Sequence, residues 1–288
     1  MEEMIDKMDA AIKIALNNSL QKLEDKFDAD VIFFFGEIRY GSESGYRTFI
    51  EHLQEEKDKH DRLVIFLNTP GGVVEAVEKF DNINRHFYEE VFFVVPDAAM
   101  SAGTVFCLSG DKIYMDYSSS LGPIDPQVFN GKQYVPALGY LDKVNEMIAK
   151  STNRGLLSQA ELVFLQQQDI AFLRACEQQR DLTIDLIQEW LVKYKFKNWN
   201  THSDGRPVTK EDKRQRAKEI ASKLGDNKVW LSHGRCIDIK KLKEMKLEID
   251  DYSEDKELKK LIRDYNNLII SYISRFRYQF FLHSRNYF

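Results

Sequence analysis

A chain of 288 residues with 43% hydrophobic and 30% charged residues can bury a sizeable core as one large domain or two small ones. Its net charge of −5 argues against general nucleic-acid affinity, and its longest apolar runs are far shorter than the roughly twenty residues that span a bilayer, so no stable membrane insertion is expected. The acidic N-terminus lacks a signal-peptide pattern, and the three cysteines have neither disulfide-framework nor metal-ligand spacing. We therefore expect a cytoplasmic protein without metal or cofactor.

The first half of the chain alternates between helix and strand patterns. Residues from about 4 to 27 have the apolar spacing of an amphipathic helix. The expected elements that follow are a strand over 31–38, a helix over 46–57, a strand over 63–67, a helix over 73–87, a strand over 91–96, a helix over 102–108 and a strand over 112–115. Such alternation with right-handed crossovers predicts an α/β fold with a mostly parallel sheet and flanking helices.

The second half of the chain is mainly helical by its apolar period. Residues from about 155 to 225 are rich in Gln and charged residues, and we interpret them as a helical insertion. Within it, Thr209 stands three positions before Asp212, which predicts a capping box for a helix through Leu224. The predicted division is an N-terminal helix over 1–28, a core domain over 29–252 and one long C-terminal helix over 253–288. The two terminal amphipathic helices suit oligomerisation.

Two short turns of small residues lie about thirty positions apart, each directly after a predicted buried strand. They are Asn68-Thr69-Pro70-Gly71-Gly72 and Met100-Ser101-Ala102-Gly103-Thr104. In parallel sheets, sites gather at the carboxyl ends of the strands, so both turns are expected at one edge. Each turn precedes a helix-compatible stretch, and helix N-termini direct N–H groups at negative charge. A serine between such donors is a candidate acyl-transfer site.

These residues resemble the Clp-protease/crotonase superfamily, and within it most closely the serine dehydrogenase proteinase group, which is related to signal peptide peptidase A. Residues 68–72 match an Asn-Ser-Pro-Gly-Gly turn of the Clp proteolytic subunit, and residues 99–103 match its nucleophile turn. Residues 121–127 resemble a Gly-Pro-Ile-Asp-Pro stretch of the group, and 230–235 with 245–250 resemble the closing segment of peptidase A relatives. The similarity spans roughly residues 30 to 252.

The resemblance implies a Clp-protease/crotonase-like core and a hydrolase activity, that of an ATP-independent serine endopeptidase. Ser101 would be the nucleophile, and the N–H groups of Gly71, Gly72 and Ala102 would form the oxyanion hole. The implied substrate is a peptide or unfolded protein, and the implied assembly is a homo-oligomer, a trimer or larger ring. A closed assembly would admit only small or unfolded substrates.

The general base is predicted to be a lysine. In the Clp subunit a histidine follows the serine, but here no histidine lies between His86 and His202. Peptidase A relatives use a Ser–Lys dyad, which requires a lysine in an apolar, water-poor pocket. Four lysines compete for this role: Lys112, Lys132, Lys143 and Lys150.

Lys143 is the favoured lysine. It lies 42 positions after Ser101, close to the spacing of the family's Ser–Lys pairs, and Tyr140 and Met147 could shelter it on one helix face. Asp142 beside it could instead turn it towards solvent. Lys132, in a glycine-containing loop, is the next choice.

Two other interpretations remain open. A catalytically silent or crotonase-like scaffold could use the same oxyanion hole for an acyl group or thioester, although crotonase-type sequences normally place acidic residues near that hole. A dehydratase or dehydrogenase is less favoured, because no Gly-x-Gly-x-x-Gly fingerprint is present. His233 is interpreted as packing the last core segment rather than as a third catalytic residue.

Overall fold

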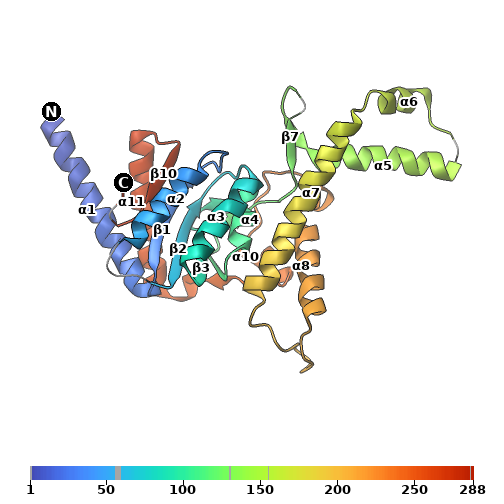
Figure 1. Cartoon of the computed structure of the whole chain (residues 1–288). Helices are drawn as coiled ribbons and strands as arrows, with labels where there is room; N and C mark the ends of the chain where they lie inside the picture. Colours follow the sequence, from blue (N-terminus) through green and yellow to red (C-terminus); the bar gives the residue numbers. More distant parts are fainter. Residues whose placement is uncertain (1, 56–59, 130, 155, 286) are drawn as a thin grey trace.

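The computed structural model describes residues 2–55, 60–129, 131–154, 156–285 and 287–288 (Figure 1). Residue 1, where the predicted N-terminal helix begins, and residue 155, where the predicted helical insertion begins, lie outside this description. Residues 56–57, at the end of the predicted helix over 46–57, lie outside it as well. Within the described residues the fold is α/β and its central sheet has six strands, which follow one another in space in the order β10 (Phe280–His283), β1 (Asp30–Gly36), β2 (Arg62–Asn68), β3 (Glu90–Val94), β5 (Lys112–Met115) and β9 (Asp250–Asp251). The five neighbouring strands β1, β2, β3, β5 and β9 of this sheet pair in parallel, which confirms the predicted fold class.

The sheet is buried on both faces, which explains why its strands are continuous apolar runs. Along β1, Val31 and Phe33 face one layer of helices, whereas Ile32 and Phe34 face the other, and all four are fully buried. This alternation follows from the two-residue period of a strand. Strands β2 and β3 repeat the pattern, so two hydrophobic cores share one sheet.

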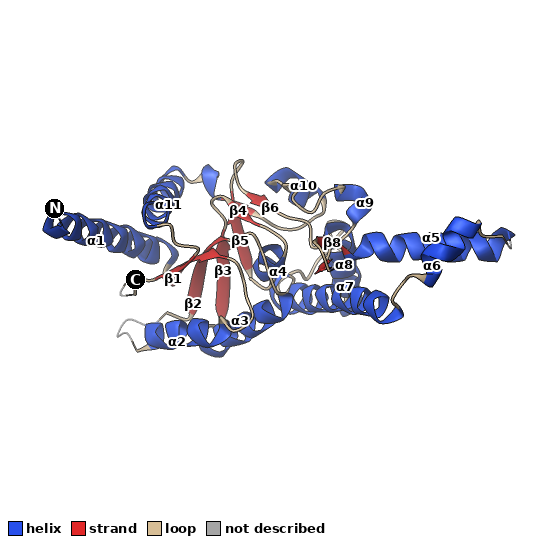
Figure 2. Ribbon diagram, turned by 90° about the horizontal axis from the view of Figure 1, so that it is seen from above, coloured by secondary structure: helices blue, strands red, loops and turns tan. Residues whose placement is uncertain are grey.

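Helices α1 (Glu2–Phe27) and α11 (Lys256–Phe276) cover one face of the sheet (Figure 2). Leu16 and Leu20 of α1 pack with Ile262 and Tyr265 of α11 in the core on that face. The opposite face is covered by α2 (Glu43–Gln54), α3 (Val74–Phe87) and α4 (Ala102–Leu108). The predicted helices and strands of the first half therefore form, with ends displaced by a few residues.

The C-terminal segment departs from the prediction of one long helix. Helix α11 ends at Phe276, and the chain reverses at Arg277, which has a left-handed φ of 57°. It returns as β10, which pairs antiparallel with β1 in a register that places His283 opposite Phe33. The apolar stripe of α11 packs against the sheet of its own chain and forms part of the hydrophobic core. A role of residues 253–288 in oligomerisation remains a prediction.

A second region, which we call the helical arm, projects from this core (Figure 1). It comprises the hairpin β7 (Gln127–Phe129) and β8 (Tyr134–Pro136), helices α5 (Ala137–Arg154) and α6 (Gln159–Gln166), and the first half of α7 (Ile170–Trp190). The helical insertion thus begins near residue 137, earlier than predicted, because residues 137–154 are also helical. The second half of α7 returns to the core, where Ile187 and Trp190 are buried.

Shorter elements connect the arm with the end of the core. A π-helical turn, η1 (Leu191–Lys195), extends α7, and α8 (Lys210–Leu224) follows; the remaining short elements are β4 (Ala98–Ala99), β6 (Ser120–Leu121), α9 (Asn227–Trp230), α10 (Ile239–Glu244) and η2 (Tyr252–Glu254). The predicted capping box of α8 is confirmed, because the Asp212 N–H donates to the Thr209 hydroxyl over 3.1 Å. No helix in the described ranges combines the length and apolarity that crossing a bilayer requires.

Candidate active site

The two small-residue turns lie side by side, as the sequence predicts. The Thr69 N–H donates to the Ala98 carbonyl over 3.0 Å, and the Met100 N–H donates to the Thr69 carbonyl over 2.9 Å. These bonds form a parallel bridge between Thr69 and Ala99, beyond the carboxyl end of β2. The backbone of one turn therefore fixes the position of the other.

Gly71 and Gly72 are required by the close approach of their backbone to neighbouring segments. Their φ angles are +106° and +142°, which side chains rarely allow. A Cβ on Gly71 would lie 2.7 Å from Ser101 Cβ, and a Cβ on Gly72 would lie 1.9 Å from the carbonyl oxygen of Ile38. The first turn is thus packed directly against the serine of the second.

Ser101 sits in a strained backbone conformation at the junction between β4 and α4. Its φ of 52° and ψ of −118° are unusual for a residue with a side chain. The Gly103 N–H donates to the backbone carbonyl of Met100, and the Thr104 N–H donates to the backbone carbonyl of Ser101, each over 2.8 Å. These two bonds close a sharp strand-to-helix turn. Such a turn presents its side chain at the top of a sheet, as nucleophile elbows do.

At the serine turn, the Ser101 hydroxyl and two backbone N–H groups have no hydrogen-bond partner among the described residues. Within the described part of the chain, the Ser101 hydroxyl makes no hydrogen bond, and the N–H groups of Gly72 and Ala102 have no acceptor. The Gly71 N–H differs, because it donates to the Thr69 hydroxyl over 3.0 Å. Ala102 begins α4, and the first N–H groups of a helix have no acceptor within the helix.

Thr104, which the sequence analysis did not single out, joins the turn to the segment that follows β6. Its fully buried hydroxyl accepts from the Gly122 N–H and lies 2.9 Å from the carbonyl oxygens of Ala99 and Gly122. A Cβ on Gly122 would lie 3.0 Å from the Ser101 nitrogen. The stretch quoted as a family motif therefore begins in contact with the serine turn.

Lys143 lies on α5 of the helical arm. Its ammonium is 3.0 Å from a carboxylate oxygen of Glu146, its side chain is 53% exposed, and it makes no hydrogen bond with Ser101 among the described residues. Met147, one of its two predicted shelters, is buried in its own right. The structure does not bring the predicted base and nucleophile together, so the role of Lys143 stays a prediction.

None of the other three candidate lysines donates a hydrogen bond to the Ser101 hydroxyl among the residues that the structure describes. Lys150 pairs with Glu161 over 2.7 Å, and the Lys112 ammonium lies over the ring of Phe92. Lys132 is exposed in the loop between β7 and β8.

His233 contacts a buried carboxylate, which the sequence analysis did not predict. Its Nδ1 lies 2.9 Å from Oδ1 of Asp125, which is 3% exposed, and Gln127 donates to the other carboxylate oxygen over 3.0 Å. Two hydrogen bonds between Leu121 and Ile237 hold the two segments together. The Asp in the Gly-Pro-Ile-Asp-Pro stretch was the available signal for this pair.

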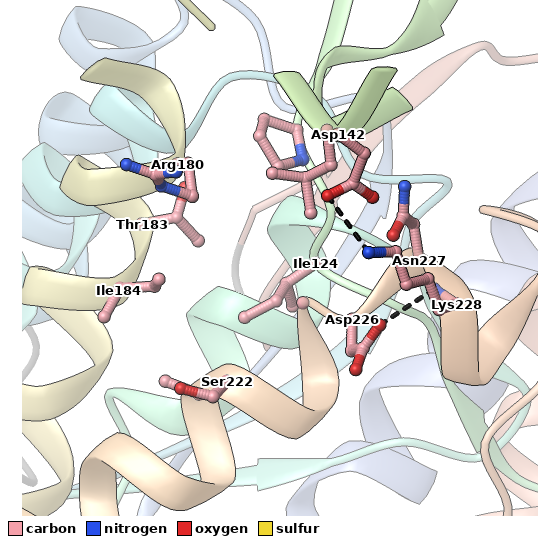
Figure 3. A pocket seen from close by; sticks show the side chains of 13 residues that line it. Ile124, Asp142, Arg180, Thr183, Ile184, Ser222, Asp226, Asn227 and Lys228 are labelled. Carbon is pink, nitrogen blue, oxygen red and sulfur yellow. Dashed lines mark hydrogen bonds and ion pairs between the residues drawn. The ribbon is translucent and has the colours of Figure 1, made fainter. Parts of the chain in front are cut away.

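A cavity of about 300 Å³ lies beside the segment that follows Gly122 (Figure 3). Ile124 forms its inner wall, Thr183 and Ile184 of α7 face it, and Ser222 of α8 lies below. An ion pair of 3.2 Å between Asp142 and Lys228 borders it on the side of α5. The cavity thus has an apolar wall with polar groups around it, which is the usual character of a small-ligand pocket.

Comparisons with curated proteins find three partial relatives. Uncharacterized protein MJ0137 of Methanocaldococcus jannaschii is 43% identical over 25% of this chain and 24% of its own length, and uncharacterized protein MJ1495 of the same organism is 26% identical over 65% and 51%. Membrane protein NfeD1b of Bacillus subtilis is 33% identical over 28% and 19%. The chain therefore spans about half or less of the length of these relatives.

A solved structure and a protein family show further similarity to this chain. A membrane-bound stomatin-specific protease, 1510-N, solved as a serine-to-alanine mutant, aligns with a TM-score of 0.31 and 20% identity over 46% of this chain and 65% of that one. The profile of the ClpP-like SDH-type serine proteinases matches residues 50–205, more than half of this chain and a range that contains both turns. The chain therefore belongs to the family of ClpP-like SDH-type serine proteinases.

Proposed function

We propose that this chain is an ATP-independent serine endopeptidase that cleaves peptides or unfolded proteins with Ser101 as nucleophile. The observation that carries the proposal is the strained Ser101 turn, packed against Gly71 and flanked by two amides without acceptors. Backbone strain of this kind persists where the surroundings enforce it, and it is concentrated at functional sites. Family membership supports the same reaction class.

In the proposed reaction, Ser101 Oγ attacks the scissile carbonyl carbon while the base removes its proton. The carbonyl oxygen becomes an oxyanion that accepts hydrogen bonds from the N–H groups of Gly72 and Ala102. We assign Gly71 mainly to the shape of the turn, because its N–H already donates to Thr69. The base then protonates the leaving amine, and a water activated by the same base hydrolyses the acyl-enzyme.

We propose Lys143 as this base in an assembled form of the protein. A lysine is an effective base only when burial destabilises its charge, and Lys143 is exposed and paired with Glu146 in the single chain. Packing of the helical arm over the serine turn in a trimer or larger ring would remove water from Lys143. Exposed apolar side chains along the arm support such packing: Ile148, Leu156, Leu162, Val163 and Ile170.

His233 is the second candidate base, favoured by its contact with Asp125. A buried carboxylate that holds one ring nitrogen of a histidine orients the ring, as in Ser-His-Asp triads. Nε2 would then be the nitrogen available to the serine. This alternative keeps Ser101 and the oxyanion donors unchanged.

The test combines a fluorophosphonate probe with hydrolysis of unfolded casein between pH 6 and 10. We expect wild type to be labelled and Ser101→Ala to be neither labelled nor active. Lys143→Met should abolish hydrolysis, whereas Lys150→Met, a lysine on the same helix that also pairs with a glutamate, should retain it. Activity that survives Lys143→Met but not His233→Gln would assign the base to His233.

The competing class of function is a crotonase-like or catalytically silent scaffold that binds an acyl group or thioester in the same oxyanion hole. This scaffold would leave Ser101 unlabelled by every probe at every pH, and Ser101→Ala would retain thioester binding. That combination of results would refute the peptidase. The cytoplasmic location remains a proposal, supported by three cysteines without disulfide partners.

A further inference from the structure

A second cavity, of about 570 Å³, lies where η1 meets the loop that leads to α8. Its walls come from the end of η1, from α8 and from the segment before β9, and none of its lining residues belongs to the two small-residue turns. The lining includes Lys195, Phe196, Trp199, His202, Arg216 and Glu248. The volume is within the range of small-molecule sites.

Lys195 is the unusual member of this lining. It is 9% exposed, it lines the cavity, and its ammonium has no hydrogen-bond or ion-pair partner among the residues that the structure describes. Burial lowers the pKa of Lys195 to about 8, although the carboxylates of Asp250, Glu248 and Asp111 act in the opposite direction. The Lys195 ammonium therefore has no direct partner at the cavity wall among the described residues, and it is available to an anionic ligand that binds there.

The backbone at Lys195 is also specialised. Residues 191–195 form a π-helical turn, closed by a hydrogen bond of 2.7 Å from the Phe196 N–H to the Leu191 carbonyl. Single π-helical turns are rare and are found frequently at functional sites. Here the turn ends with Lys195 at the cavity wall, followed directly by Phe196.

The remaining lining residues add positive charge and an aromatic wall. Arg216 and Lys246 accompany Lys195, whereas Glu248 is the one carboxylate of the lining that the structure describes; Arg216 shares its charge with Glu219, 3.0 Å away. Phe196 and Trp199 meet edge to face with their ring centroids 5.6 Å apart, and His202 meets Trp199 in the same way. Cations and aromatic rings in the lining of one cavity suit a ligand that is anionic at one end and planar at the other.

We propose that this cavity binds a small phosphate monoester carrying a planar ring, a mononucleotide in size and chemistry, with its phosphate on Lys195 and Arg216 and its ring against Trp199. Two cations favour phosphate, which accepts several charge-assisted hydrogen bonds at once. The site is independent of the peptidase proposal, because it shares no residue with the serine turn.

Calorimetric titration of the full chain with four probes tests the site: adenosine monophosphate, ribose 5-phosphate, adenosine and benzoate. We expect the nucleotide to bind, ribose 5-phosphate to bind at least tenfold more weakly, and adenosine and benzoate not to bind. Lys195→Met should weaken nucleotide binding at least tenfold. Lys193→Met, an exposed lysine of the same π-helical turn that does not line the cavity, should leave binding unchanged.

Thermal unfolding without ligand provides the second readout. If Lys195 is retained for a ligand, Lys195→Met should raise the melting temperature by about 2 °C or more, because it removes an ammonium whose charged form is destabilised by burial. A structural role for Lys195 predicts the opposite shift. The proposal is overturned if adenosine monophosphate does not bind to wild type, if benzoate binds in its place, or if Lys195→Met binds like wild type.

Discussion

The core and the helical arm differ in how completely their apolar side chains are buried and their backbone is hydrogen-bonded within a single chain. In the core, the strands are fully buried and backbone hydrogen bonds join the two site turns. The arm is held by a small cluster of Ala137, Leu141 and Cys176, while Leu156 and Ile170 are 78% and 81% exposed. The proposed nucleophile is thus held in position within one chain, whereas the proposed lysine base lies on a region whose apolar surface is left uncovered.

Glycine substitutions should separate the two regions most strongly. Gly72→Ala places a Cβ within 1.9 Å of the Ile38 carbonyl oxygen at a φ of +142°, so the turn must move. We expect a loss of about 4 kcal/mol in the free energy of unfolding, together with loss of hydrolysis. Urea denaturation followed by circular dichroism measures the change in the free energy of unfolding. A stable Gly72→Ala variant would show that the turn is not as rigid as its contacts indicate.

Acid should weaken the core through a buried histidine. His283 is fully buried; its Nδ1 lies 2.8 Å from the Tyr265 hydroxyl and its Nε2 lies 3.2 Å from Oδ1 of Asn17. Burial lowers the pKa of His283 to about 3. The unfolded chain binds a proton below about pH 6.5 while the folded chain does not, so stability is lost as the pH falls from 6.5 towards 3.

The pH effect is measured as a difference between two proteins. The stability advantage of wild type over His283→Gln should shrink by about 3 kcal/mol between pH 7 and pH 4. Using the difference matters, because burial raises the pKa of Asp81 to about 6, and protonation of Asp81 stabilises the fold as the pH falls from 6 towards 3.8. An advantage that does not change with pH would mean that His283 becomes protonated without opening the core.

The difference between local sequence pattern and tertiary packing explains what the sequence could predict. Continuous apolar runs such as 63–67, followed by small-residue turns, specify both a buried strand and the position of the turn after it, so the site turns were placed correctly. The pairing of β10 with β1 joins residues at least 244 positions apart, and the contact of His233 with Asp125 joins residues 108 positions apart. Such contacts depend on tertiary packing, and no local periodicity encodes them. The apolar spacing of α11 was recognised, but the pattern alone cannot tell whether its partner is a sheet of the same chain or another subunit.

Removing a threonine hydroxyl should have a smaller effect that again depends on the region. Thr104→Val preserves shape but leaves the buried Gly122 N–H without its acceptor, which should cost about 2 kcal/mol and reduce hydrolysis by loosening the serine turn. Thr152 of α5 also bonds a backbone carbonyl, that of Ile148, but it is exposed. Thr152→Val should therefore change stability by less than about 0.5 kcal/mol. Equal effects in urea denaturation would contradict the distinction between the regions.

The smallest expected effect has the opposite sign. Gly139 lies in α5, and a Cβ built on it meets no atom within 4 Å. Gly139→Ala should therefore stabilise the helix by about 0.5–1 kcal/mol, because alanine loses less backbone entropy on folding than glycine. Local hydrogen exchange of α5 amides is the suitable measurement, since global unfolding reports mainly on the core. If the arm packs over the serine turn in an assembly, the added methyl group should also alter hydrolysis there, whereas a freely projecting arm would gain protection without any change in rate.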